Sequence, residues 1–393
     1  MKDSPIEEVN PDIESIVKGN TAFALDLYER LKSTEKNLFF SPYSISLALA
    51  MTYAGARKET ERQIAQVLHF TSGQQQLHQI FACLEMELKA VQDWSGILLQ
   101  TANSLWPQTG YPLLKEFLKL VNNSYGVVVT AVDYQKDPET AENIINAWVA
   151  EKTKDKIQNL IPVNSLNELT RLVLVNAIYF QVNWKNKFDN TLTETAPFWI
   201  TSAKKIQVPM MEQQETFGYR ETEDLQVLQL PYVGNDLSML VLLPKQINGL
   251  RKVEDNLTLE NLANWVEGLQ EREVRVFLPR FRVSSQFKLN ETLIAMGMRD
   301  GFDENKANFS GMDGRENGLY IGAVVHQAFV NVNEEGTEAA AATAIGMVNL
   351  CCSEPPLPVP VFKVDRPFIF LIREKITGSV LFLGKIVNLE GSL

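Results

Sequence analysis

The order of structural patterns along the chain is the strongest constraint on its fold. Apolar residues recur every three or four positions in the first third, which predicts helices, whereas the second half is mostly strand-like runs. Helices followed by strands, without strict strand–helix–strand alternation, predict an α+β fold with large antiparallel or mixed sheets. The predicted helices cover 13–31, 44–56, 58–68, 75–91, 111–126, 145–157 and 290–297. The predicted strands cover 97–106, 127–134, 171–184, 203–211, 225–232, 237–244, 274–289, 323–334, 368–375 and 379–388.

The composition indicates one large globular unit. Of the 393 residues, 45% are hydrophobic and 22% are charged, which is ample material for a core. No linker-like stretch, repeat or low-complexity block divides the sequence, so we expect a single domain over residues 1–393. The net charge is −11 and acidic residues are spread along the chain, which argues against nucleic-acid or membrane partners, because both need clustered Lys and Arg.

The N-terminus and the cysteines bear on the cellular compartment. The opening MKDSPIEEVNPDIES carries acidic residues where a secretory signal would carry an apolar run. If Met1 is the native start we expect a cytoplasmic protein, and an extracellular one is possible if it is not. The three cysteines, Cys83, Cys351 and Cys352, cannot form a disulfide framework and fit a reducing compartment.

Catalytic and metal-binding motifs find little support. The three histidines form no paired metal spacing, and the sequence has no nucleophile elbow or phosphate-binding loop. His326 lies on the same side of an alternating strand as Val324 and Ala328, so we expect an interior, hydrogen-bonded histidine. Cys351 and Cys352 look reactive, but no cationic neighbour lowers their pKa and no histidine is near in sequence. We therefore predict no enzyme activity, no cofactor and no metal.

The segment around EEGTEAAAATAIGMVNL, residues 334–350, contradicts its strand-rich surroundings. Its alanine run favours a helix, yet it is short and bounded by glycines, so it is not stable as an isolated helix. Small residues on both faces would let an extended segment slide between two existing strands, although a plain linker is an equally good interpretation of these residues alone. With a period of two, one face carries Thr337, Ala339, Ala341 and Thr343, and the other carries Glu338, Ala340, Ala342 and Ala344.

Several ordered motifs resemble one family. The NEEGTEAAAATA segment is similar to the hinge of the reactive-centre loop of inhibitory serpins. VFKVDRPFIFLI, with GSVLFLGKIVN after it, is similar to the C-terminal serpin signature, and NLFFSPYSISLALAMTYAGA resembles the second helix of the family. The matches run from Asn37 to Asn388, so the resemblance covers nearly the whole chain.

The resemblance implies a role for particular residues. It places a reactive-centre loop at about residues 334–355 and the scissile bond between Leu350 and Cys351. It matches Trp184 to the breach, the point where the loop enters the main sheet. The shutter, a polar cluster behind that sheet, is matched by Ser41, Ser44, Asn176 and His326. The hinge is matched by Glu335, Gly336, Thr337, Glu338, Ala339, Ala340, Ala341, Ala342 and Thr343.

The resemblance also implies a fold and a mechanism. It implies three β-sheets with eight or nine helices and an exposed reactive-centre loop that enters the main sheet as an added strand after cleavage. The target protease would then be held as a covalent acyl complex, and the inhibitor would be a monomer. Leu350 before the scissile bond suits the hydrophobic pocket of a chymotrypsin- or elastase-like protease. A register shift would move the bond to Asn349 or Cys351, and Met347 and Val348 are alternative cleavage positions.

Two alternatives stay open within the family, and one lies outside it. A non-inhibitory serpin would act as a carrier, chaperone or storage protein, but its hinge would tend to carry bulky, charged or proline residues, which this hinge lacks. A second alternative is an inhibitor of cysteine proteases, since some members of the family inhibit them. The alternative outside the family is an enzyme that uses Cys351 or Cys352 as its nucleophile. Helix 75–91 has a single Lys amid its glutamates, so we expect no activation by heparin. Asp155 stands where the family often has glycine, which should affect only a helix end.

Overall fold

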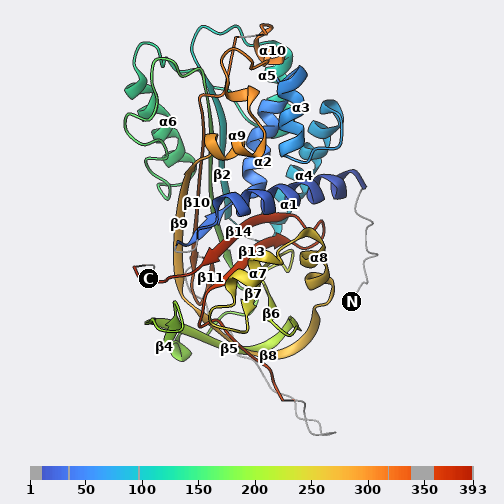
Figure 1. Ribbon diagram of the computed structural model, residues 1–393, viewed down its shortest axis with the longest axis vertical. Helices are drawn as coiled ribbons and strands as arrows, with labels where there is room; N and C mark the ends of the chain where they lie inside the picture. Colours follow the sequence, from blue (N-terminus) through green and yellow to red (C-terminus); the bar gives the residue numbers. More distant parts are fainter. Residues whose placement is uncertain (1–10, 34–35, 96–97, 317, 338–357, 392–393) are drawn as a thin grey trace.

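The computed structural model describes residues 11–33, 36–95, 98–316, 318–337 and 358–391. Its strands form two hydrogen-bonded sheets that share a core with most of the helices (Figure 1). The helices are α1 (Pro11–Leu31), α2 (Pro42–Tyr53), α3 (Lys58–Val67), α4 (Gln74–Ser95), α5 (Lys115–Tyr125), α6 (Pro138–Lys152), α7 (Leu250–Asp255), α8 (Leu259–Glu267), α9 (Asn290–Met296) and α10 (Ser310–Asp313).

The smaller sheet has five strands in the order β2-β3-β11-β10-β9. Helix α6 packs on one face of this sheet and α2 packs on the other (Figure 1). We call these the α6 face and the α2 face. The strands are β2 (Leu98–Pro107), β3 (Leu172–Asn183), β9 (Phe281–Lys288), β10 (Ala323–Val332) and β11 (Gly336–Thr337).

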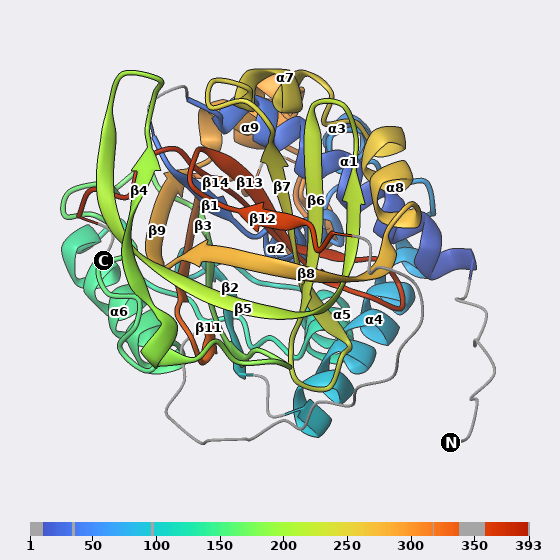
Figure 2. The same cartoon turned by 90° about the horizontal axis from the view of Figure 1, so that it is seen from below.

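The larger sheet has nine strands, with the order β1-β14-β13-β7-β6-β5-β8-β12 and β4 attached to β5. Figure 2 shows the long, curved β5 running beside β8 across the underside of the molecule. The strands are β1 (Leu38–Phe40), β4 (Glu194–Trp199), β5 (Lys205–Glu221), β6 (Leu225–Pro231), β7 (Leu237–Pro244), β8 (Gln270–Pro279), β12 (Val361–Lys363), β13 (Phe368–Glu374) and β14 (Val380–Ile386).

The α+β class is confirmed, and the sheet count differs from three for a physical reason. β5 pairs with β4 near Met210 and with β6 from Gly218 onwards, while β8 follows it in between. One long strand therefore joins what the resemblance implied as two separate sheets. The described part of the chain has ten α-helices, against the eight or nine implied, with short ones such as α10 included.

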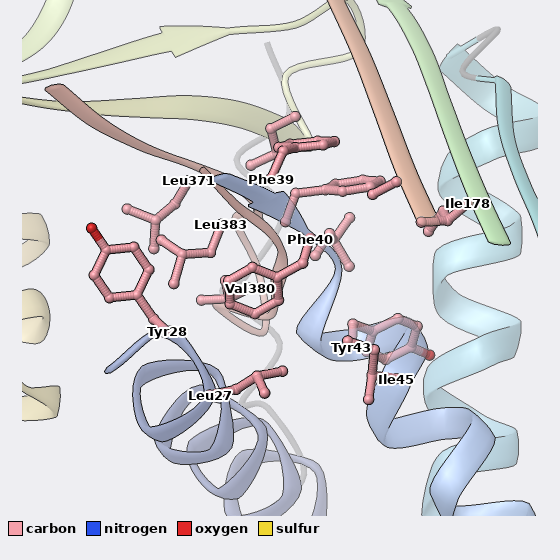
Figure 3. Close-up of a cluster of buried hydrophobic side chains, with 14 of the residues drawn as sticks. Leu27, Tyr28, Phe39, Phe40, Tyr43, Ile45, Ile178, Leu371, Val380 and Leu383 are labelled. Carbon is pink, nitrogen blue, oxygen red and sulfur yellow. The ribbon is translucent and has the colours of Figure 1, made fainter. Parts of the chain in front are cut away.

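The core is built around α2, every residue of which is buried. A helix that is apolar on all sides needs neighbours on all sides, and α2 contacts β2, β3 and β14 as well as α1. Figure 3 shows part of this core, in which Phe39 and Phe40 of β1 gather with side chains of α1 and α2 and with those of the last two strands, such as Leu383. Phe39 stacks against the ring of Phe382 with ring centroids 5.2 Å apart.

Two predicted elements were wrong in part. Residues 127–134 are not a strand, and they carry only a single bridge from Val132 to Gln108. The reason is that the valines do not share a buried face, since Val128 is 71% exposed while Val132 is 5% exposed. Helix 145–157 ends earlier, at Lys152, because Lys154 and Asp155 have left-handed backbone angles, with φ of 49° and 60°. Asp155 lies just beyond the end of α6, and its effect on that helix end stays a prediction.

Candidate functional site

The first residues of the expected hinge are already part of the five-stranded sheet. β11 lies between β3 and β10, with Gly336 opposite Asn183 and Thr337 opposite both Val182 and Val332. Beyond β11 the two neighbouring strands pair directly and in parallel, from Phe329 with Tyr179 to Ala323 with Val173. This directly paired stretch, which we call the seam, is the only part of the β3–β10 contact that an added strand would have to open. The rest of the expected hinge, residues 338–343, lies outside the described residues, as do Leu350, Cys351 and Cys352.

Gly336 is required by a close approach of two backbones. Its φ is +152°, and a Cβ built there would lie 2.2 Å from the carbonyl oxygen of Val182 and 2.5 Å from the Cα of Asn183. Only glycine fits this position without displacing β3.

Thr337 is fully buried and is held through its hydroxyl. Its Oγ1 lies 3.1 Å from the hydroxyl of Tyr232, which follows β6. The ring of Tyr232 stacks on Trp184 with centroids 4.6 Å apart and planes within 5°. Burial raises the pKa of Tyr232, so its hydroxyl stays protonated and can donate to Thr337. A large or charged side chain has no room at this position.

The backbone just before β11 is tied to the segment that follows β3. The backbone N–H of Trp184 donates to the carbonyl of Glu335 (2.9 Å), and its indole Nε1–H donates to the carbonyl of Asn333 (2.9 Å). The backbone N–H of Phe188 donates to the carbonyl of Glu334 (3.0 Å). Trp184, predicted as the breach residue, therefore lies where β11 enters the sheet.

A buried carboxylate strengthens the same junction. Glu334 is 3% exposed, and the guanidinium Nε of Arg280 lies 2.6 and 2.7 Å from its two oxygens. The hydroxyl of Thr193 donates to Glu334 as well. Burial by itself would raise the pKa of Glu334, but the bonds from Arg280 and Thr193 outweigh it and the pKa is lowered. Glu335, more exposed, forms an ion pair with Lys187 at 2.6 Å.

The four expected shutter residues converge behind the seam, where α2 begins. Ser41 caps α2, because its Oγ accepts from the backbone N–H of Ser44 (3.2 Å) while it donates to the carbonyl of Leu381 (2.7 Å). Asn176 of β3 donates from Nδ2 to the carbonyl (2.8 Å) and the hydroxyl of Ser44. The predicted residues Ser41, Ser44, Asn176 and His326 are thus in one hydrogen-bonded cluster.

His326 of β10 joins the two strands of the seam. Its register partner is Asn176, whose Oδ1 accepts from Nδ1–H of the imidazole. Nε2 accepts from the backbone N–H of Ser41 (3.1 Å), which fixes the neutral tautomer. Burial lowers the pKa of His326 to about 3, and the bond with Asn176 offsets only part of the shift. The prediction of an interior, hydrogen-bonded histidine is confirmed.

Sequence reasoning missed three residues of this region. Asn103 of β2 accepts from the amide of Asn176 and from the hydroxyl of Ser44 (3.1 Å) and so belongs to the shutter cluster. Tyr232 contacts Thr337, and Arg280 pairs with Glu334, a residue within the predicted reactive-centre loop. A polar residue at an inward position of a strand was the available signal for Asn103, whereas the partners of Arg280 and Tyr232 depend on long-range strand placement.

No helix in the described ranges is long and apolar enough to cross a membrane. Among the same residues, no three His, Cys, Asp or Glu side chains gather as a metal-binding group.

The structure thus combines a two-residue strand between β3 and β10 with a buried polar cluster behind the seam. The model of the serpin (serine protease inhibitor) family matches residues 18–389, and the chain belongs to this family. The leukocyte elastase inhibitor of Homo sapiens is 41% identical over 383 residues, covering 95% of the chain and 99% of that relative.

Solved structures agree with the family assignment. A highly specific serpin from the insect Tenebrio molitor superposes with a TM-score of 0.85 at 32% identity, covering 98% of the chain and 100% of that structure. Human thyroxine-binding globulin in complex with thyroxine also gives a TM-score of 0.85, at 33% identity, covering 96% of the chain and 99% of that structure.

Proposed function

We propose that this chain inhibits serine proteases of the elastase or chymotrypsin type by acting as a suicide substrate. The observation that carries the proposal is the position of β11, with Thr337 already inserted between β3 and β10 while the seam beyond it is closed. The similarity to leukocyte elastase inhibitor supports a target of this class.

In the proposed reaction, the serine of the protease attacks the carbonyl carbon of Leu350. The bond to the nitrogen of Cys351 breaks, the new amine leaves, and the protease is esterified to Leu350. The freed hinge segment then extends β11 along the seam and carries the attached protease with it. Trapping succeeds if this extension is faster than hydrolysis of the ester by water, which is the competing outcome.

Each part of the site has a proposed role in that extension. The hinge, from Glu335 to Thr343, supplies the added strand, and Gly336 and Thr337 fix its register. The shutter residues Ser41, Ser44, Asn176 and His326 keep the seam closed before cleavage, and Trp184 at the breach holds the entry point. We further propose a single-domain monomer whose partner is the protease itself. A cytoplasmic location and independence from heparin stay predictions.

A carrier function is the second candidate, because human thyroxine-binding globulin, whose solved structure is similar to that of this chain, is complexed with thyroxine. Thr337 argues against this alternative, because strand insertion requires a small residue in register with the sheet. Its side chain is small and buried, and its backbone already pairs with Val182.

A panel experiment separates the candidates. We would incubate the full chain with chymotrypsin-, elastase-, trypsin-, subtilisin- and papain-like proteases, and analyse the products by denaturing gel and mass spectrometry. We expect a covalent adduct with an elastase- or chymotrypsin-like enzyme, in which Leu350 is linked to the protease, and a released fragment with a new N-terminus at Cys351. Complete cleavage without an adduct would refute inhibition, and an adduct only with the papain-like enzyme would reassign the target class.

A further inference from the structure

An aromatic pair bridges the seam next to β11. Tyr179 of β3 and Phe329 of β10 are register partners, and theirs is the pair of the seam that lies nearest to β11. Their rings stack with centroids 5.8 Å apart and planes within 26°. Both side chains are nearly buried, at 1% and 5% exposure.

A cation covers each ring. The guanidinium carbon of Arg282, on β9, lies 4.8 Å from the centroid of Phe329. The ammonium of Lys156, in the segment after α6, lies 5.5 Å from the centroid of Tyr179. Such contacts attract the cation to the ring face and add to the stacking of the rings. We call these four side chains the aromatic clasp.

The clasp is unlike the rest of the seam. The pairs farther from β11 on the same face are Ala177 with Gln327, Val175 with Val325 and Val173 with Ala323, in which no ring faces another across the strands. The largest cross-strand contact on this face therefore lies where separation of the two strands would begin.

Extension of β11 would part the clasp directly. Thr337 pairs antiparallel with Val182 and with Val332, so position 340 falls opposite both Tyr179 and Phe329. Adjacent strands lie about 4.8 Å apart, so one inserted strand moves these two residues to about 10 Å apart. That separation exceeds the roughly 4.5–7 Å over which aromatic rings attract each other.

We infer that the aromatic clasp is the first barrier to strand insertion and that Tyr179, Phe329, Arg282 and Lys156 set the rate at which the seam opens. This inference rests on the proposed function. The four residues act by positioning β3 and β10 and do not touch the scissile bond.

The test measures insertion without any protease. Native full-length protein is incubated with a synthetic peptide of residues 338–348, which continues from β11, and the complex is followed over time by native gel and mass spectrometry. We expect Phe329→Leu and Tyr179→Leu to accelerate peptide uptake by about threefold to tenfold, because the ring stacking is lost. Arg282→Gln and Lys156→Gln should accelerate it by about twofold to fivefold. Tyr179→Phe keeps the ring and should retain the rate of the wild type.

A matched control separates seam opening from general loss of stability. Phe217→Leu removes the same ring from β5 of the nine-stranded sheet, where the side chain is 2% exposed. It should lower the unfolding midpoint as much as Phe329→Leu but leave peptide uptake unchanged. The two cations are exposed, so their substitutions leave the core intact and keep the test decisive if a leucine variant fails to fold.

Two results would overturn the inference, and they are distinguishable. If the wild type takes up the peptide and the clasp variants do so no faster, the clasp does not limit opening, and the proposed function stands. If the wild type takes up no peptide under any condition short of unfolding, the sheet does not accept a strand, and both the inference and the proposed function fail.

Discussion

Replacing Thr337 with arginine tests the inhibitory mechanism at a hinge side chain that is fully buried. Threonine fits this position because its small side chain lies between the two sheets and its hydroxyl meets that of Tyr232 at 3.1 Å. An arginine would have to enter the same space before any later part of the hinge followed. We expect Thr337→Arg to convert the protein from an inhibitor into a substrate.

The size of the effect follows from two losses. Removing the partner of the buried Tyr232 hydroxyl costs about 1–3 kcal/mol. Burying a guanidinium without a carboxylate costs several kcal/mol more, since even relaxed protein interiors penalise an unpaired ion by that amount. A total of about 5 kcal/mol corresponds to more than a thousandfold in equilibrium or rate. Hydrolysis of the acyl-enzyme would then win over insertion at almost every encounter.

The assay is the stoichiometry of inhibition, read together with a denaturing gel. Thr337→Ser keeps the hydroxyl and should behave as the wild type. Thr337→Val keeps the shape but leaves the hydroxyl of Tyr232 without its partner, so the stoichiometry should rise modestly. Thr337→Arg should give cleaved chain and free, active protease without a stable adduct.

The same three variants of Thr337 also show which results would refute this reasoning. A stable complex of Thr337→Arg at the stoichiometry of the wild type would mean that position 337 need not enter the sheet. Equal losses in the valine and arginine variants would mean that the hydroxyl pair, and not burial of charge, controls insertion.

Three further outcomes are expected. Glu334→Gln should lower the free energy of unfolding by about 1–2 kcal/mol in denaturant titrations. The loss is smaller than for a fully buried ion pair because the side chain of Arg280 is 40% exposed, and an unchanged unfolding midpoint would contradict it. Gly336→Ala should raise the stoichiometry of inhibition, because its Cβ would meet a carbonyl at 2.2 Å, and wild-type stoichiometry would exclude this clash. Burial lowers the pKa of His326 to about 3 and that of His78 to about 4. The pKa of a histidine in the unfolded chain is about 6.5, so on acidification the unfolded state binds protons before the folded state does. The free energy of unfolding should therefore fall by about 1.4 kcal/mol per pH unit per histidine below pH 6.5, and a His78→Asn variant with an unchanged pH slope would contradict this.

Local patterns in the sequence predicted the features that depend on one element at a time. Alternation along β10 placed His326 inward, and the buried cluster around it confirms this. The same period of two put Thr337 on one face of the hinge, and that side chain is buried. The strand prediction failed for residues 127–134, because a strand also needs a partner edge, and this segment forms a single bridge, from Val132 to Gln108 just after β2.

Local patterns in the sequence did not predict the contacts between distant segments. The ion pair of Arg280 with Glu334 and the contact of Tyr232 with Thr337 arise because β9, β6 and β11 meet at one junction. No local period specifies that meeting, since it depends on the register of several long-range pairings. The resemblance supplied Asn176 and Trp184 but not Asn103, whose role follows only from the pairing of β2 with β3.

The order of contacts along the seam assigns different kinetic roles to the parts of the site. From β11 onwards, an added strand would first meet Tyr179 with Phe329 on the α6 face, and then Asn176 with His326, which join the same two strands from the α2 face. Under the proposed mechanism, the hinge decides whether insertion begins and the aromatic clasp how fast it begins. The polar pair then decides whether it continues, because Asn176 and His326 must exchange buried hydrogen bonds for new ones and cannot be left unpaired. Substitutions at Asn176 should therefore stall insertion part of the way, a result that neither hinge nor clasp variants would give.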